Sequence, residues 1–315
     1  MAQVSGSEAA LAAKQSCTIE IAGIRLQYVT HEPDLNLQVR GASRLFIVPD
    51  NGAADTVLEF SLGDLSADVT GELLFDSGAT WKLFRAPEGY IYRLATDYFG
   101  PTPFRVAYFN EDFSAARIVI HRAYREAWEN FNPSEYPLDE LLLVQLLAQG
   151  RGAELHSTGI VDEAGNGYLF LGQSGAGKTT TSMLWLEHPG VSILSDDRII
   201  LRLDDNGKVW MHGTPWHGLG ELSRAAKAPL KHIFFIEKGP QAEFFEIATG
   251  DAVARLFSCS FPTFHNAAGI EFTLNFYEQV LTSVPAAILS FCPDQTAVEA
   301  VRQRVAGLYT SRKRI

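Results

Sequence analysis

The residues with the clearest chemistry form a glycine-rich segment between Gly172 and Thr179. The segment GQSGAGKT matches the pattern Gly-x-x-x-x-Gly-Lys-Ser/Thr at every fixed position. It follows the apolar run YLFL and precedes a stretch of helical character, which is the context that a phosphate-binding loop requires. Glycines let successive backbone N–H groups point at phosphate oxygens, and the following helix adds its positive N-terminal dipole. The segment therefore predicts a P-loop that binds a nucleoside triphosphate with Mg²⁺.

Each position of this loop has an expected role. Lys178 should reach the β- and γ-phosphates, and the hydroxyl of Thr179 should bind Mg²⁺. Thr180 lies further round the helix, where packing or capping is the alternative role. The expected nucleotide-binding residues are Gly172, Gln173, Ser174, Gly175, Ala176, Gly177, Lys178, Thr179 and Thr180. A P-loop contacts phosphates and not the base, so ATP is assumed and GTP is not excluded.

Two acidic residues end the next apolar run, SILSDDR, at Asp196 and Asp197. A strand-end aspartate beside a P-loop commonly holds the metal, directly or through water. A second carboxylate can accept a proton from an attacking hydroxyl. The alternative is that one of the two aspartates caps a turn.

A histidine and a second glycine-rich loop could complete the site. His156, in ELHSTGIV, is expected on the strand before the P-loop strand, but a lone histidine is more often a satisfied core or surface residue. The segment HGTPWHGLGELSR follows a strand and predicts a loop. Trp216 and His217 could stack on a base or close over the phosphates, and Arg224 could neutralise phosphate charge. A packed tryptophan in an ordinary turn is an equal alternative.

The pattern in the first half of the chain predicts a β domain. From Cys17 to about Arg122, short apolar runs are broken by Gly, Pro, Asp and Asn, which favours mostly antiparallel strands. The aromatic residues on these runs are interpreted as core. Ser134 and Pro137 are start signals for a helix of about a dozen residues that ends near Gly150.

Beyond that helix, strands alternate with helices, including a helix from Lys178 through Leu186, and this order favours a parallel-sheet α/β architecture. The expected organisation is a flexible tail over residues 1–16 and two domains. Residues 17–132 form a β-rich domain that could recognise a substrate or partner. Residues 133–315 form a P-loop kinase-like α/β domain.

Composition excludes some partners. The 315 residues are 46% hydrophobic and 20% charged, as in an ordinary globular enzyme. The net charge of -11 disfavours nucleic acid, because proteins that bind it concentrate Lys and Arg. The three cysteines (Cys17, Cys259 and Cys292) have no metal or redox spacing and are expected to be free. No long apolar run or signal-like start is present, which predicts a cytoplasmic protein without a membrane partner.

Four segments in order, LHSTGIV, GYLFLGQSGAGKTTTSMLWL, ILSDDRIIL and GTPWHG, resemble the bacterial HPr serine kinase/phosphorylase family. The same P-loop core is similar to that of phosphoenolpyruvate carboxykinase. The resemblance covers about residues 150–240 and implies an α/β phosphoryl-transfer core of this type. It makes Lys178 the phosphate-binding lysine and Thr179 the Mg²⁺ residue. It also makes Asp196 the general base, Asp197 a metal contact and His156 an active-site residue, and it makes a homo-oligomer plausible.

The chain also departs from this family. The Arg-Gly-Leu-Gly segment of the bifunctional enzymes is missing, because the nearest stretch, from His217 to Glu221, has no arginine at its head. Phosphorylase activity and HPr as substrate therefore do not follow. A carboxykinase would need a longer chain and additional substrate-binding arginines.

The predicted function is a Mg²⁺- and ATP-dependent kinase that transfers the γ-phosphoryl to a hydroxyl group. The acceptor could be a serine of a protein or peptide, or a small metabolite. A nucleotide-gated regulatory protein without catalysis and a simple NTPase are the alternatives.

Overall fold

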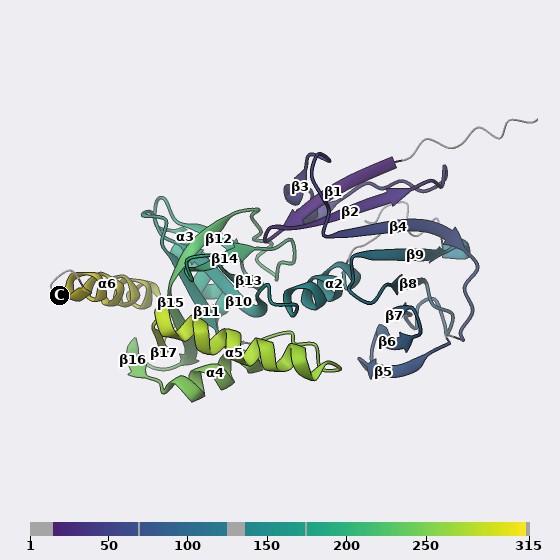
Figure 1. Cartoon of the computed structure of the whole chain (residues 1–315). Helices are drawn as coiled ribbons and strands as arrows, with labels where there is room; N and C mark the ends of the chain where they lie inside the picture. The colour runs from purple at the N-terminus through teal and green to yellow at the C-terminus, as the bar shows by residue number, and fades with distance from the viewer. Residues whose placement is uncertain (1–14, 69, 125–135, 174, 313–315) are drawn as a thin grey trace, which may run out of the picture. The chain divides into compact units, whose positions relative to one another are not determined.

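A computed structural model describes residues 15–68, 70–124, 136–173 and 175–312 of the chain. It has mixed α/β structure, with two large sheets and a few helices (Figure 1). The chain separates into two compact units. One comprises residues 1–20, 24–41 and 47–138, and the other comprises residues 21–23, 42–46 and 139–315. The mixed α/β class expected from the sequence is confirmed.

The described part of the first unit is built on a nine-stranded sheet with the order β3-β1-β2-β4-β9-β8-β7-β6-β5. Antiparallel pairing predominates, as predicted, but β4 runs parallel to both β2 and β9. The elements of this part of the chain are β1 (Gln15–Ile21), β2 (Ile24–Thr30), η1 (Gly41–Phe46), β3 (Ile47–Val48), β4 (Thr56–Gly63), β5 (Glu72–Asp76), β6 (Trp81–Ala86), β7 (Gly89–Leu94), β8 (Arg105–Phe109), β9 (Ala115–His121) and η2 (Arg122–Tyr124), of which η1 falls almost entirely in the second unit.

Aromatic side chains fill the core of this first sheet. Tyr28 packs edge-on against Phe60 with ring centroids 5.7 Å apart, and Tyr92 packs against Phe109 at 5.9 Å. All four side chains are buried. The prediction that aromatic residues of this half pack in the core is confirmed for Tyr92, Phe104 and Phe109, whereas Trp81, Tyr90 and Phe99 are only half-buried.

The second unit contains an eight-stranded sheet and the helices. Its strands are β10 (Ala153–Val161), β11 (Gly167–Leu171), β12 (Ser192–Ser195), β13 (Arg198–Leu203), β14 (Val209–Gly213), β15 (Lys227–Lys238), β16 (Glu243–Glu246) and β17 (Ala286–Phe291). Its helices are α2 (Leu138–Leu147), α3 (Lys178–Leu186), α4 (Thr249–Ser258), α5 (Ala267–Ser283) and α6 (Gln295–Arg312). Helix α3 has the bounds expected from the sequence. The start signal Ser134 lies outside the described residues.

The expected parallel sheet is wrong for most of this unit. Among the described strands of this unit, only β11, β15 and β17 run parallel, whereas β10 pairs antiparallel with β11, β12 and β13. The reason is the short turn between Val161 and Gly167, because a tight hairpin joins only antiparallel strands. A buried strand is apolar on both faces in either orientation, so the sequence pattern could not distinguish them.

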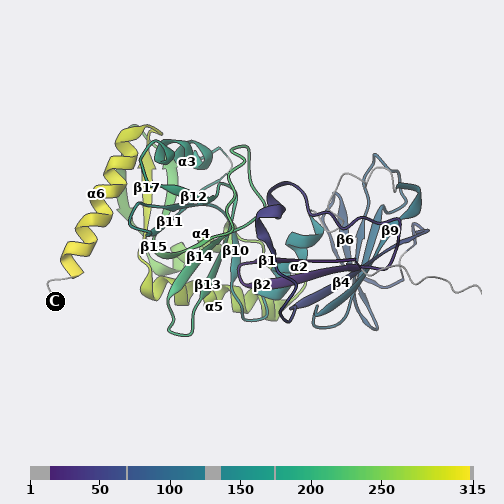
Figure 2. The same cartoon turned by 90° about the horizontal axis from the view of Figure 1, so that it is seen from above.

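Helices cover both faces of this second sheet (Figure 2). Strand β11 is buried throughout, and its side chains alternate between two cores. Leu169 and Leu171 pack in the core that includes residues of α4 and α5, whereas Tyr168 and Phe170 pack with Trp185 of α3 and with α6. The end of β11 is therefore held from both sides, and the glycine-rich segment begins there.

Candidate active site

The glycine-rich loop connects the end of β11 to the start of α3. Gly175 and Gly177 have φ angles of +77° and +111°, which side-chain-bearing residues rarely adopt. A Cβ atom on Gly172 would lie 2.8 Å from both the Ala176 Cβ atom and the Ile236 Cγ1 atom. Gln173 is exposed and Ala176 is half-buried, whereas Ser174 lies outside the described residues. Glycine is therefore required where the chain turns sharply and where it packs closely.

Lys178 is the first residue of α3 and points inward. The buried residues of the helix are Lys178, Thr181, Ser182 and Trp185, a spacing that places them on one helical face. The Nζ atom of Lys178 donates to the carbonyl of Gly172 at 2.8 Å, so the side chain folds back over the loop. Thr179 is half-buried and Thr180 is exposed, away from this face. The loop and the helix together hold a buried ammonium group at the sheet edge.

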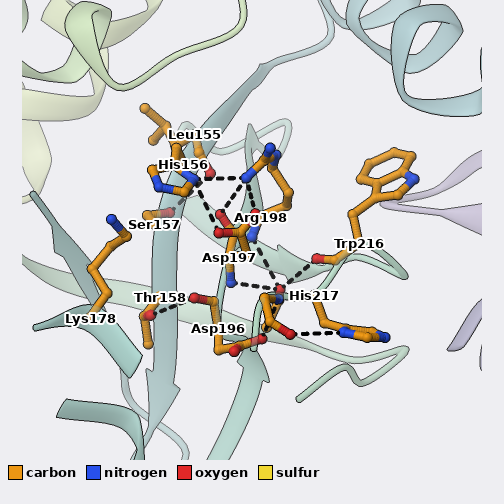
Figure 3. Close-up of polar contacts among 12 residues, drawn as sticks. Leu155, His156, Ser157, Thr158, Lys178, Asp196, Asp197, Arg198, Trp216 and His217 are labelled. Carbon is orange, nitrogen blue, oxygen red and sulfur yellow. Dashed lines mark hydrogen bonds and ion pairs between the residues drawn. The ribbon is translucent and has the colours of Figure 1, made fainter. Parts of the chain in front are cut away.

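His156 and Arg198 lie on neighbouring strands next to this loop. They are directly paired in the register of β10 and β13, and Ser157 is paired with Leu171 at the end of β11. The Nη1 atom of Arg198 is 2.7 Å from Nδ1 of His156. In the view of Figure 3 the imidazole lies between Arg198 and Lys178. The strand pairing thus places His156 beside the glycine-rich loop.

Asp197 joins this group from the bend between β12 and β13. Its Oδ1 atom is 3.3 Å from Nδ1 of His156, and its Oδ2 atom accepts a hydrogen bond from Arg198 (Figure 3). Burial alone would raise the pKa of Asp197. The contact with His156 and the charges of Arg198 and Lys178 outweigh burial and lower this pKa below its usual value. Asp197 is therefore an ionised carboxylate with 24% of its side chain exposed.

Lys178 and Asp197 interact electrostatically. Burial lowers the pKa of Lys178, and the negative charge of Asp197 partly offsets that effect. The structure therefore brings together three of the predicted residues, His156, Lys178 and Asp197.

Asp196 points elsewhere, although it precedes Asp197 directly. Its side chain is 1% exposed, and its two carboxylate oxygens accept hydrogen bonds from the backbone N–H groups of Gly218 at 2.9 Å and Gly220 at 2.8 Å. A Cβ atom on Gly220 would lie 2.6 Å from Asp196 Oδ2, so this approach requires glycine. Asp196 anchors the loop that follows β14.

That loop contains the predicted substrate residues. Trp216 is buried, and its carbonyl accepts a hydrogen bond from Ser195 at 3.0 Å, whereas His217 and Arg224 are exposed. Within the described chain, no hydrogen bond or ion pair joins these three residues to His156, Lys178 or Asp197. Leu219, at the loop's tip, is 99% exposed. The described polar contacts thus do not link these three residues to the lysine.

Two buried glutamates lie behind Arg198. Glu140 of α2 accepts a hydrogen bond from Arg198 Nε at 2.8 Å, and Glu154 of β10 lies 3.8 Å from the same nitrogen. Burial and the negative charge of Glu140 raise the pKa of Glu154 well above its usual value, which favours its neutral form. The charge of Arg198 is therefore balanced mainly by Glu140 and Asp197.

Sequence reasoning missed Arg198, Glu140 and Glu154 as parts of the site. A signal was present in β10, because Glu154 and His156 are two residues apart in a mostly buried strand and so share one face. Arg198 was visible only as the residue after the aspartates. Its hydrogen bond to Glu140 joins residues 58 positions apart, so it could be recognised only in the folded structure.

A cavity of about 570 Å³ adjoins the loop. Its walls include Gly172 and Gln173 of the loop, Glu237 and Lys238 at the end of β15, and Arg255 of α4. Arg255 Nη1 is 2.6 Å from Glu237 Oε1. The cavity falls in the usual size range of small-molecule sites.

Among the residues that the structure describes, no three His, Cys, Asp or Glu side chains gather in a way that would hold a metal ion. The three cysteines are free thiols, as predicted. No helix in the described part of the chain is both long and apolar enough to cross a membrane.

No protein-family model matches the chain, and no curated protein matches it. The geometry of the residues themselves therefore carries the functional argument.

Proposed function

We propose that this chain is a Mg²⁺- and ATP-dependent phosphotransferase with a P-loop core, which transfers the γ-phosphoryl to a hydroxyl acceptor. One observation carries the proposal: buried Lys178, at the start of a helix behind a glycine-rich loop, interacts with Asp197, which contacts His156 on the adjacent strand. A cation beside an ionised carboxylate at the N-terminus of a helix suits the transfer of a phosphoryl group.

The loop would hold the phosphates. Backbone N–H groups around Gly175 and Gly177 and the N-terminus of α3 favour bound anions. The ammonium of Lys178 now donates to a carbonyl oxygen, and a phosphate oxygen is a stronger, charged acceptor for the same hydrogen. The cavity beside the loop has room for the nucleoside or for a small acceptor.

Magnesium fits this donor set only together with phosphates. Mg²⁺ in such enzymes is bound by one or two protein oxygens, by water and by the substrate phosphates. The hydroxyl of Thr179 would supply one protein oxygen, and the partly exposed Asp197 could act through a water molecule. When bound, the metal would neutralise charge on the phosphates.

We assign the proton-accepting role to Asp197 and not to Asp196. The resemblance to HPr kinases suggested Asp196, but both of its oxygens are occupied by backbone N–H groups and its side chain is buried. Asp197 is ionised, partly exposed and close to Lys178. It can accept the hydroxyl proton while Lys178 stabilises the phosphates.

The test has two steps. The first is calorimetric titration with Mg²⁺ and a non-hydrolysable ATP analogue, and the second is transfer of label from γ-labelled ATP to free serine and to serine-containing peptides. Wild type should bind and transfer, whereas Asp197→Asn should bind and transfer at least about 100-fold more slowly. If Lys178→Met bound the analogue as tightly as wild type, the proposal would be abandoned. Binding without transfer, unchanged in Asp197→Asn, would favour a nucleotide-gated regulatory protein.

A further inference from the structure

The glycine-rich loop has different neighbours on its two sides. Strand β11, which leads into the loop, lies between β10 and β15 in the sheet. Asp197 is on the β10 side, where its carbonyl oxygen accepts a hydrogen bond from the backbone N–H of Ser157 at 3.0 Å. The cavity of about 570 Å³ is on the β15 side, where Phe235, Glu237 and Lys238 line it. The proposed proton acceptor and the cavity therefore flank the loop.

These positions assign the two ends of a bound nucleotide. In phosphoryl transfer the attacking and leaving oxygens lie roughly in line, so the acceptor and the nucleoside are on opposite sides of the transferred group. Because Asp197 is assigned the proton of the acceptor, the nucleoside belongs on the β15 side. The carbonyl of Cys259, which lines the cavity, accepts a hydrogen bond from the backbone N–H of His156 at 2.7 Å. The cavity and the site are thus adjacent, and one ligand can reach both.

Glu237 is the acidic side chain among those that line the cavity. Leu171 pairs with Phe235 in the parallel register of β11 and β15. Two residues further along both segments, Glu237 and Gln173 both line the cavity, one strand spacing of about 4.8 Å apart in an ideal sheet. Oε1 of Glu237 is 2.6 Å from Nη1 of Arg255, and the described residues make no other hydrogen bond or ion pair with this carboxylate. Its second oxygen is therefore available to a ligand next to the loop.

We propose that the cavity binds the nucleoside and that Glu237 recognises the ribose by accepting hydrogen bonds from its hydroxyl groups. The inference rests on the proposed binding of a nucleoside triphosphate at the loop. The ribose follows the phosphates in a nucleotide, and its two hydroxyls are donors for a carboxylate, which would repel a phosphate. Arg255 holds the carboxylate through the other oxygen. The apolar side chains of Leu171, Phe235 and Ile236 form further walls, which suit the faces of a base.

Three probes separate the parts of the nucleotide by calorimetric titration with Mg²⁺: ADP, 2′,3′-dideoxy-ADP and pyrophosphate. Wild type should bind ADP about 10-fold more tightly than dideoxy-ADP, because the hydroxyls donate to a charged, half-exposed acceptor. Glu237→Ala should bind the two nucleotides equally. Glu246→Ala is the matched control, since Glu246 is exposed on β16 and does not line the cavity, and it should keep the difference. Equal affinities in wild type, or a difference that persists in Glu237→Ala, would overturn the role of Glu237.

Filling the cavity tests its occupant. Ser258 lines the cavity from the end of α4 and is exposed, so Ser258→Trp adds volume there without entering the core. This variant should bind ADP at least about 10-fold more weakly than wild type. Pyrophosphate should bind as in wild type, which also shows that the variant folds. Ala254→Trp is the control, because Ala254 is exposed on the same helix but does not line the cavity, and it should bind ADP normally.

The same titrations separate this inference from the proposed function. If ADP and pyrophosphate bind wild type equally and Lys178→Met weakens both, the nucleoside site is refuted while the phosphate loop stands. If Ser258→Trp leaves the affinity for ADP unchanged and raises KM for the acceptor, the cavity holds the acceptor and the inference is overturned, although phosphoryl transfer stands. If neither ADP nor pyrophosphate binds wild type, the proposed function fails and the nucleoside site fails with it.

Discussion

Asp196 and Asp197 are adjacent in the chain, yet their carboxylates serve different parts of the structure. Asp196 accepts two backbone hydrogen bonds from the loop at Gly218 and Gly220, whereas Asp197 contacts His156 and Arg198. The bend between β12 and β13 separates them. The sequence suggests that the two aspartates act together, but in the structure Asp196 holds the loop after β14 and Asp197 faces the proposed active site.

This division predicts opposite phenotypes for two equivalent substitutions. Asp196→Asn turns an NH₂ group toward one of two backbone N–H groups, so it should cost about 1–3 kcal/mol of unfolding free energy. It should also increase hydrogen exchange in residues 216–221. Asp197→Asn removes a charge that faces Arg198 and so also lowers stability, but it should leave exchange in this loop nearly unchanged and slow transfer at least about 100-fold. Equal effects of the two variants on loop exchange would contradict the assignment.

Substitution of Lys178 tests the loop directly. Lys178→Met keeps the length and packing of the side chain but removes the charge, so the affinity for the ATP analogue should fall about 10- to 100-fold. The melting temperature should change little, because the ammonium donates to loop carbonyls and the attraction of Asp197 only partly offsets the cost of its burial. Lys208→Met is the control, since Lys208 is exposed and its Nζ atom lies 4.2 Å from the centre of the Trp210 ring. Binding that survives in Lys178→Met would show that the phosphates lie elsewhere.

The backbone of the loop predicts a glycine requirement. Gly177 has a φ angle of +111° directly before α3, so Gly177→Ala should cost about 1–3 kcal/mol and weaken nucleotide binding. A Cβ atom added to Gly250, within α4, would meet no heavy atom within 4 Å, and Gly250→Ala should be neutral or stabilising. Chemical denaturation of both variants measures the difference. Equal stabilities would contradict the structure of the loop.

Acid stability should depend on His232. Burial, with a smaller effect of the Arg304 charge, lowers the pKa of His232 to about 4. Between its unfolded pKa of about 6.5 and this value, the unfolded chain binds a proton that the folded chain does not, so stability falls as pH falls. The loss from this residue should reach about 3 kcal/mol near pH 4.

His232→Phe isolates this contribution. The phenyl ring can keep the stacking on Phe234, whose centroid is 4.1 Å from that of His232. Denaturation of the variant and of wild type at pH 7 and pH 4.5 should show a smaller acid-induced loss in the variant. Parallel losses in the two proteins would refute the contribution of His232.

Local patterns predicted the local parts of the site. The glycines of the loop and the helical spacing that buries Lys178 and Trp185 lie within about a dozen residues, so the sequence specified both. The position of His156 beside the loop depends on the tight hairpin between β10 and β11. No protein-family model and no curated protein matches the chain, so the resemblance to HPr kinases and the kinase activity stay predictions.

Contacts between residues far apart in the sequence could not be predicted from the sequence pattern. Contact between Arg198 and Glu140 joins a strand to a helix 58 residues earlier, and no periodicity encodes it. The different directions of Asp196 and Asp197 depend on a backbone bend and on the loop that follows β14. The second sheet was predicted to be parallel but is mostly antiparallel, because strands that are buried on both faces have the same apolar pattern in either orientation.

Strand β10 pairs with β11 on one side and with both β12 and β13 on the other. Strand β10 therefore sets the distance from the glycine-rich loop to the bend between β12 and β13, which is two inter-strand spacings of about 4.8 Å each. Loops and helices of this unit can lengthen without altering that distance. A single residue deleted before His156 would turn the ring to the opposite face, so β10 is the segment whose length tolerates no change.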